Sequence, residues 1–104
     1  MFILIYILQV DFSMEGPFSE EMAHQFSDLA KSINKEPGFL WKIWTENEYS
    51  KEAGGIYAFE TENDAQNYLT MHSKRLASIG VNEVNAKIFT INETLTKITH
   101  GPIF

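Results

Sequence analysis

Hydrophobic and polar positions follow two different periods along this chain, and the periods predict its elements. Residues 2–12 are apolar at both alternating sets of positions, which is typical of a strand covered on two sides. Residues 18–33 carry apolar side chains every three or four positions, which indicates one helix with a single apolar stripe, formed by Phe18, Met22, Phe26, Leu29 and Ile33. Pro37-Gly38 ends this segment.

The next stretch predicts a β-hairpin. Two β-rich runs are joined by a polar connector at about residues 47–52. Alternation divides the first run into two sets of side chains, with Phe39, Trp41 and Ile43 on one face and Leu40, Lys42 and Trp44 on the other. Trp41 and Trp44 therefore point to opposite sides of the sheet, so at most one of them faces a pocket between helices and sheet.

A second helix and a last strand follow. Thr61 to Asp64 resembles a capping box with Asp in the place of the usual Glu or Gln. The apolar face of this helix is formed by Ala65, Tyr68, Leu69, Leu76 and Ile79. Gly80 is suited to its C-terminus, and residues 84–91 alternate as a strand. Residues 93–104 show no clear period, and we expect them to form a C-terminal arm of a single domain that spans residues 1–104.

The element order β-α-β-β-α-β predicts an α+β, ferredoxin-like fold, in which two helices cover one face of a four-stranded antiparallel sheet. The first strand is apolar on both faces, whereas two helices cover only one of them. An exposed apolar face of this size is unusual in a monomer. We therefore expect a homodimer that packs sheet against sheet about a two-fold axis.

Composition and charge limit the classes of binding partner and of chemistry open to the protein. The chain has 104 residues, no cysteine and a formal net charge of −6. Its eight Lys and Arg residues are scattered, which argues against nucleic acid and against anionic membranes as partners. Without cysteine there is no disulfide, thiolate metal site or cysteine nucleophile. The apolar N-terminus lacks a basic region and a small-residue cleavage site, so we expect a cytoplasmic protein.

Two motifs carry little chemistry. Gly54-Gly55 is a single pair in a strand, which indicates a bulge or a close backbone approach and not a phosphate-binding loop. His24 has the Glu-x-x-His spacing of di-iron bundles, but these sites need two such motifs. His24 also falls on the polar face of its helix, so we expect a solvated side chain and no metal site.

His72 lies on the apolar stripe of the second helix, four residues after Tyr68 and four before Leu76. One interpretation is a neutral imidazole hydrogen-bonded in the core. The other is a catalytic base that accepts a proton near neutral pH. The aromatic side chains are suited either to core packing or to binding a flat hydrophobic ligand, and the candidate substrate-binding residues are Tyr6, Phe26, Trp41, Trp44, Tyr57 and Tyr68.

Several segments also resemble a known protein family in their amino-acid sequence. PGFLWKIWTE, EAGGIYAF, YLTMHSKRL and GVNEVNAKIFTINETL occur in this order, and the match over about residues 15–98 resembles the YdhR-like family of proposed mono-oxygenases. The resemblance implies a dimeric α+β barrel, in which two ferredoxin-like sheets pack together. It also implies kinship with small oxygenases that work without flavin, metal or nicotinamide, so no cofactor is expected.

Three functions remain open. The leading hypothesis is a cofactor-independent mono-oxygenase for small aromatic or polycyclic compounds, in which His72 removes a proton and the substrate anion supplies the first electron to dioxygen. The second is a haem-binding or haem-degrading enzyme with His72 as the iron ligand. The third is a dimeric module that binds a hydrophobic ligand without converting it.

Overall fold

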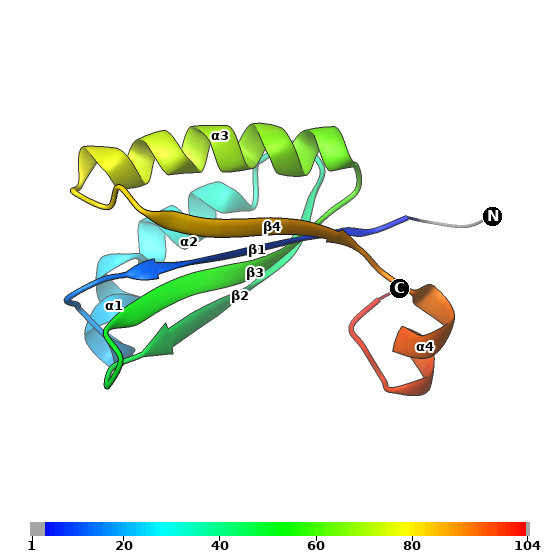
Figure 1. Cartoon of the computed structure of the whole chain (residues 1–104), viewed down its shortest axis with the longest axis horizontal. Coiled ribbons are helices and arrows are strands. Elements are labelled where there is room, and N and C mark those ends of the chain that lie inside the picture. Colours follow the sequence, from blue (N-terminus) through cyan, green and yellow to red (C-terminus); the bar gives the residue numbers. More distant parts are fainter. Residues whose placement is uncertain (1–3, 104) are drawn as a thin grey trace.

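A four-stranded antiparallel sheet forms the centre of the structure, a computed structural model that describes residues 4–103 (Figure 1). Its strands lie in the order β2-β3-β1-β4 and are β1 (Tyr6–Ser13), β2 (Phe39–Asn47), β3 (Glu52–Phe59) and β4 (Val84–Thr90). Three helices cover one face, namely α1 (Ser19–Gln25), α2 (Ser27–Ile33) and α3 (Glu62–Ser78). This arrangement confirms the predicted ferredoxin-like α+β fold.

The core lies between this face and the helices. Leu8 and Val10 of β1 are buried, and their cross-strand partners on β3 are Tyr57 and Gly55. Because side chains alternate along a strand, these positions define the side of the sheet that faces the helices. The core cluster is completed from β3 and the helices by Ile33, Phe59, Ala65 and Tyr68. Residues 2 and 3 of the predicted first strand lie outside the described residues.

The predicted helix over residues 18–33 is two helices, because the backbone leaves the helical conformation at Phe26 (φ −101°, ψ 11°). The Phe26 ring stacks on Trp44 of β2, with ring centroids 6.4 Å apart. The apolar stripe predicts which face of the segment packs on the sheet. It does not predict the break at Phe26, where the side chain contacts a strand that is distant in the sequence.

A β-bulge at the start of β2 corrects one expectation. Phe39 pairs with Phe59, whereas Trp41 pairs with Ala58, so β2 has one residue more than β3 at this point. The extra residue, Leu40, moves Phe39 to the helix side, where it packs on the core. The prediction that Phe39 shares a face with Trp41 is therefore wrong. The prediction that Trp41 and Trp44 face opposite sides is confirmed, since Trp44 pairs with Gly55 on the helix side.

The ends of α3 follow the sequence pattern. The Thr61 hydroxyl oxygen accepts a hydrogen bond from the backbone N–H of Asp64 at 3.0 Å. At the other end Gly80 has a φ of +93°, which L side chains rarely adopt. Together these caps hold the helix that carries His72 in place.

The C-terminal residues differ from expectation in containing a short helix, α4 (Glu93–Ile98), on the side of the sheet away from α3 (Figure 1). The side chain of Asn92 caps it by accepting a hydrogen bond from the N–H of Leu95 at 3.1 Å. The Trp41 indole N–H donates to the carbonyl oxygen of Pro102 at 3.1 Å. The tail therefore contacts the open sheet face of its own chain.

The described helices are all too short or too polar to cross a membrane.

Candidate functional site

A narrow, mostly apolar cavity of about 70 Å³ lies between the helices and the sheet. Strand β2 contributes Lys42 and Trp44 to its lining, and β3 contributes Tyr57. Phe26, at the junction of α1 and α2, lines the same cavity. From α3 it is lined by His72, Arg75 and Leu76. The sheet, the α1–α2 junction and α3 therefore all contribute to it.

Four of the predicted site residues line this cavity, namely His72, Phe26, Trp44 and Tyr57. Tyr68 borders it, because its hydroxyl accepts a hydrogen bond from the guanidinium of Arg75 at 3.2 Å. The other two predicted residues lie elsewhere. Tyr6 begins β1, at the end of the sheet away from the cavity, and Trp41 faces the open side.

His72 is held as a neutral imidazole. Its side chain is 5% exposed, and its Nδ1 atom lies 2.9 Å from a terminal nitrogen of Arg75. A guanidinium has no acceptor, so Nδ1 must accept this hydrogen bond and Nε2 must carry the ring proton. Burial lowers the pKa of His72 to about 3, and the positive charges of Arg75 and Lys42 add to this effect. The lone pair of the imidazole is therefore occupied.

Sequence reasoning missed Arg75 as a site residue. Arg75 follows His72 by three residues and Tyr68 by seven, so helical spacing places all three on one face of α3. This spacing was the signal that could have identified it. The Nε atom of Arg75 is buried and has no hydrogen-bond partner within residues 4–103. A ligand acceptor that reached this nitrogen would satisfy it.

Lys42 was also missed, although it shares a strand face with Trp44. Its ammonium nitrogen lies 3.3 Å from the ring centroid of Trp44 and 4.6 Å from that of Tyr57. Burial, with a smaller contribution from the positive charge of Arg75, lowers the pKa of Lys42 from 10.5 to about 7. Neutral amine is therefore abundant at neutral pH.

The Gly54-Gly55 pair makes this arrangement possible. A Cβ atom on Gly55 would lie 2.5 Å from Cε of Lys42, so a larger residue would displace the end of the lysine side chain from its position over β3. A Cβ atom on Gly54 would overlap the carbonyl oxygen of Val10 in β1. The predicted close backbone approach is therefore confirmed at Gly54, which also lines the cavity.

The two tyrosines of the site stay protonated. Burial raises the pKa of Tyr57, and it also raises the pKa of Tyr68. Their rings pack on each other with centroids 5.0 Å apart, and the Tyr68 ring stacks on His72 at 5.3 Å. They supply a flat apolar wall and neutral hydroxyl groups.

The cavity is cationic in an acidic protein. Within residues 4–103 the one ion pair joins Lys97 to Glu93, so neither Lys42 nor Arg75 has a carboxylate partner there. The cavity lining contains no Asp or Glu among these residues. A partly buried guanidinium and a partly buried amine that can carry a second positive charge, both without a carboxylate partner, favour an anionic ligand.

A groove of about 420 Å³ on the surface adjoins the cavity. Both are lined by Met22, Phe26 and Trp44, so these three side chains form the wall between them. Glu46 holds the start of α1 at the rim of this groove, since its carboxylate accepts hydrogen bonds from the N–H of Ser19 at 3.0 Å. The wall therefore separates the cavity from the larger surface groove.

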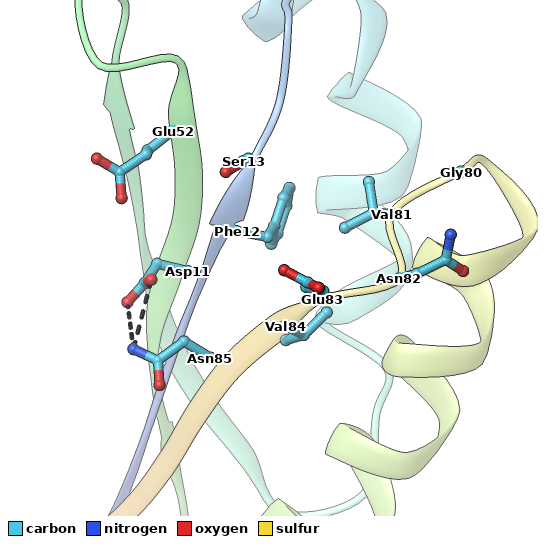
Figure 2. Close-up of a pocket in the computed structure, with 10 residues that line it drawn as sticks. All are labelled: Asp11, Phe12, Ser13, Glu52, Gly80, Val81, Asn82, Glu83, Val84 and Asn85. Carbon is cyan, nitrogen blue, oxygen red and sulfur yellow. Dashed lines mark hydrogen bonds between the residues drawn. The ribbon is translucent and has the colours of Figure 1, made fainter.

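A larger hollow of about 860 Å³ lies at the ends of β1 and β4 and is lined by acidic and polar groups (Figure 2). Asp11, Glu52 and Glu83 are among its lining residues, and the side-chain amide of Asn85 donates to the Asp11 carboxylate at 3.3 Å. It contains none of the predicted site residues. No group of three His, Cys, Asp or Glu within residues 4–103 is arranged to hold a metal ion. The acidic hollow is therefore unsuited to the anion that the cavity favours.

The fold and the cavity define a ferredoxin-like α+β protein with a cationic aromatic site, and three solved structures share the fold. The "protein of unknown function" NE2512 from Nitrosomonas europaea is 18% identical, with a TM-score of 0.62 over 86% of this chain and 91% of its own. The ActVA-Orf6 monooxygenase of Streptomyces coelicolor, solved with nanaomycin D, is 19% identical, with a TM-score of 0.57 over 84% and 87%. The N63A mutant of SnoaB, a cofactor-independent oxygenase from Streptomyces nogalater, is 17% identical, with a TM-score of 0.59 over 89% and 97%.

The family is settled by sequence. The family model described as "Putative mono-oxygenase ydhR" matches residues 7–102, and the chain belongs to this family. This confirms the resemblance expected from the sequence motifs, and membership supports mono-oxygenase function in general. No curated protein is detectably similar to the chain.

Proposed function

We propose that this protein is a cofactor-independent mono-oxygenase that acts on a small aromatic compound with an acidic hydroxyl or enol group. The observation that carries the proposal is the cavity of aromatic side chains that contains Lys42 and Arg75 and no carboxylate among the described residues. Such a site binds a flat molecule through its rings and stabilises its anion through the two cations. Family membership supports oxygenation as the reaction.

The chemistry follows from the electron count. Triplet dioxygen reacts poorly with closed-shell molecules, and an electron-rich substrate anion supplies the first electron. Without an outside reductant, the substrate supplies all four electrons. One balanced outcome converts an activated CH₂ group and O₂ into C=O and water, with one oxygen atom in each product. The protein binds the substrate, holds its anion and excludes water from the intermediate.

The size of the cavity limits what binds without rearrangement. Ligand pockets commonly measure roughly 300–1,000 Å³, whereas the cavity measures about 70 Å³. The groove beyond Met22, Phe26 and Trp44 adds about 420 Å³ when this wall opens. A substrate of two or three fused rings therefore enters through this wall, with its acidic end toward Lys42 and Arg75.

The cavity favours this function over haem binding. An iron ligand needs a free lone pair, whereas the lone pair of Nδ1 of His72 already accepts a hydrogen bond from Arg75. The oxygen-uptake experiment below distinguishes the mono-oxygenase from a protein that only binds the ligand.

Oxygen uptake with a panel of hydroxynaphthalenes and hydroxyanthracenes tests the proposal, with ¹⁸O₂ to trace the incorporated atom. We expect uptake that yields a product with one labelled oxygen, and a loss of about 10²-fold or more in kcat/KM for Arg75→Gln. Lys74→Gln, at an exposed neighbouring position, is the matched control. Tight binding of these compounds without any uptake would replace the enzyme with a ligand-binding module.

A further inference from the structure

Two side chains of the cavity carry a nitrogen that accepts protons, His72 and Lys42. The imidazole has one lone pair in its neutral form, and that lone pair accepts the hydrogen bond from Arg75. Its other nitrogen carries a proton and is a donor. His72 must therefore break its bond with a buried guanidinium before it takes a proton from a substrate.

Lys42 has no such restriction. Its side chain crosses β3 above Gly55, and its nitrogen lies over the rings of Trp44 and Tyr57 at the cavity wall. No carboxylate within residues 4–103 pairs with it. An amine above aromatic rings keeps its lone pair available when it is neutral, and as an ammonium it is stabilised by the ring faces. Both protonation states are therefore accommodated in one place.

We propose that Lys42 is the general base of this site, and that the substrate class is an aromatic hydroxyl compound held as its anion between Lys42 and Arg75. This inference rests on the proposed function, because it assigns the proton transfer that precedes the reaction with dioxygen. His72 is then a positioning residue that orients the Arg75 guanidinium toward the bound anion.

The step balances without another reactant. The substrate O–H bond breaks, its electron pair stays on oxygen, and the proton forms a fourth bond to nitrogen of Lys42. The neutral amine becomes an ammonium beside the new phenolate or enolate. The unpartnered Nε–H of Arg75 supplies a donor for the same oxygen or for a second oxygen of the substrate.

The charges around Lys42 fix the direction of its pH dependence. Arg75 and His72 face it from α3 and Tyr57 from β3, while α1, the α1–α2 junction and α2 contribute the apolar Met22, Phe26 and Leu29. Of these groups Arg75 is charged at neutral pH, and it favours the neutral amine. Activity should therefore rise with pH through about 7 and then level off.

Anaerobic binding of 4-nitrophenol, whose anion absorbs at longer wavelength than the neutral phenol, tests the ionisation without oxygen chemistry. Below the pH at which the free phenol ionises, we expect the wild-type protein and His72→Gln to bind it as the yellow anion. Lys42→Met should bind it as the neutral phenol, with about tenfold or greater loss of the anion's affinity. Anion binding that persists in Lys42→Met, or that disappears in His72→Gln alone, would overturn the assignment.

Kinetics separate the base from a fixed charge. Lys42→Arg keeps a cation but cannot lose its proton near neutral pH. We expect about 10²-fold or greater loss of kcat/KM in Lys42→Arg and Lys42→Met, loss of the rise in activity through about pH 7, and partial rescue of Lys42→Ala by methylamine. His72→Gln should keep the rise.

The two proposals fail in different ways. Full oxygen uptake with an unchanged pH profile in Lys42→Met overturns the role of Lys42 and leaves the mono-oxygenase in place. Anaerobic ionisation by the wild type without uptake of oxygen for any hydroxyaromatic compound overturns the mono-oxygenase and leaves Lys42 as the group that ionises the ligand.

Discussion

At the scale of single residues, the site combines features that oppose folding. Lys42 brings a cation into an aromatic environment, Arg75 adds a second, and a hydrogen bond between two basic groups joins Arg75 to His72. Buried charges without counter-charges destabilise the folded state. Such features persist where function requires them, and they make the stability of the protein dependent on pH in a predictable direction.

Lys42→Met should stabilise the protein while it lowers kcat/KM by about 10²-fold or more. Because the pKa of Lys42 falls from 10.5 in the unfolded chain to about 7 in the fold, the unfolded chain binds more protons between these values. Wild-type stability therefore rises with pH across this window. We expect the variant to gain about 1 kcal/mol or more at pH 6. The gain should shrink toward pH 10, as measured by thermal unfolding followed by circular dichroism.

Lys74→Met is the matched control, because Lys74 is an exposed lysine of α3 that lies outside the open sheet face. It should show no gain that depends on pH. An equal gain at pH 6 and pH 10 in Lys42→Met would show that packing, and not the charge, sets its effect.

His72→Gln should protect the protein against acid. Between pH 6.5 and about 3 the unfolded chain protonates this histidine and the folded chain does not, so wild-type stability falls as the pH falls. Glutamine offers Arg75 an acceptor oxygen and does not titrate. We expect the variant to retain about 2 kcal/mol more stability at pH 4, relative to pH 7, than the wild type. Denaturant unfolding at both pH values measures this, and His24→Gln at an exposed position of α1 should behave as wild type.

Prediction of the site from sequence succeeded where helical spacing sufficed. The spacing from Tyr68 to Leu76 placed His72 against the sheet, and the structure agrees. It did not identify Lys42, because a lysine in a strand is ordinarily solvated and its burial depends on the missing side chain of Gly55, which lies on another strand. The sequence also left open whether His72 is a catalytic base or a core histidine. The answer depends on its hydrogen bond with Arg75, which the helical spacing allows but does not require.

At the scale of elements, the break between α1 and α2 gives the cavity its wall. Phe26 stands at the break and stacks on Trp44. Two short helices that meet at a non-helical residue separate at lower cost than the turns of one continuous helix, because fewer backbone hydrogen bonds cross the junction. The wall between cavity and groove is therefore the element most suited to open for a substrate.

Phe26→Ala should widen the range of ligands. Removing the ring joins the cavity to the groove, so affinity for 1-hydroxypyrene should rise about tenfold relative to 4-nitrophenol, at a cost of about 1–3 kcal/mol in stability. Fluorescence and absorbance titrations measure both affinities. Phe39→Ala removes a similar ring on the same sheet face but outside the cavity and the groove. Equal gains in both variants would show general loosening and contradict a wall at Phe26.

Local periodicity explains which elements were predictable. The strands and the capped helix over residues 62–78 follow from alternation, helical spacing and the Thr61 cap. The break at Phe26 and the bulge at Leu40 do not, because each lies at a contact between segments far apart in the chain, which local periodicity does not contain. The helix over residues 93–98 was missed because it is short and buries no side chain.

At the scale of the whole molecule, part of the open face of the sheet is apolar. The strand register aligns Trp41, Ala58, Ile7 and Phe89 in one row across all four strands. In the next row Ile43 pairs with Ile56, and Ile43 is 50% exposed. The tail contacts this face at Trp41. The row that begins at Trp41 continues beyond this contact to Phe89, which is 48% exposed.

We propose that a second copy of the chain covers this face, as the pattern of the first strand predicts. A charge at Ile43 would then be buried against an apolar partner, so Ile43→Asp should weaken association by about 10²-fold or more. Sedimentation equilibrium should give twice the 11.9 kDa chain mass for the wild type and the single mass for the variant. Tyr49→Asp, in the fully exposed β2–β3 turn, should remain dimeric. A wild-type protein that stays at the single mass at millimolar concentration would show that the face is solvated, and that one chain contains the complete site.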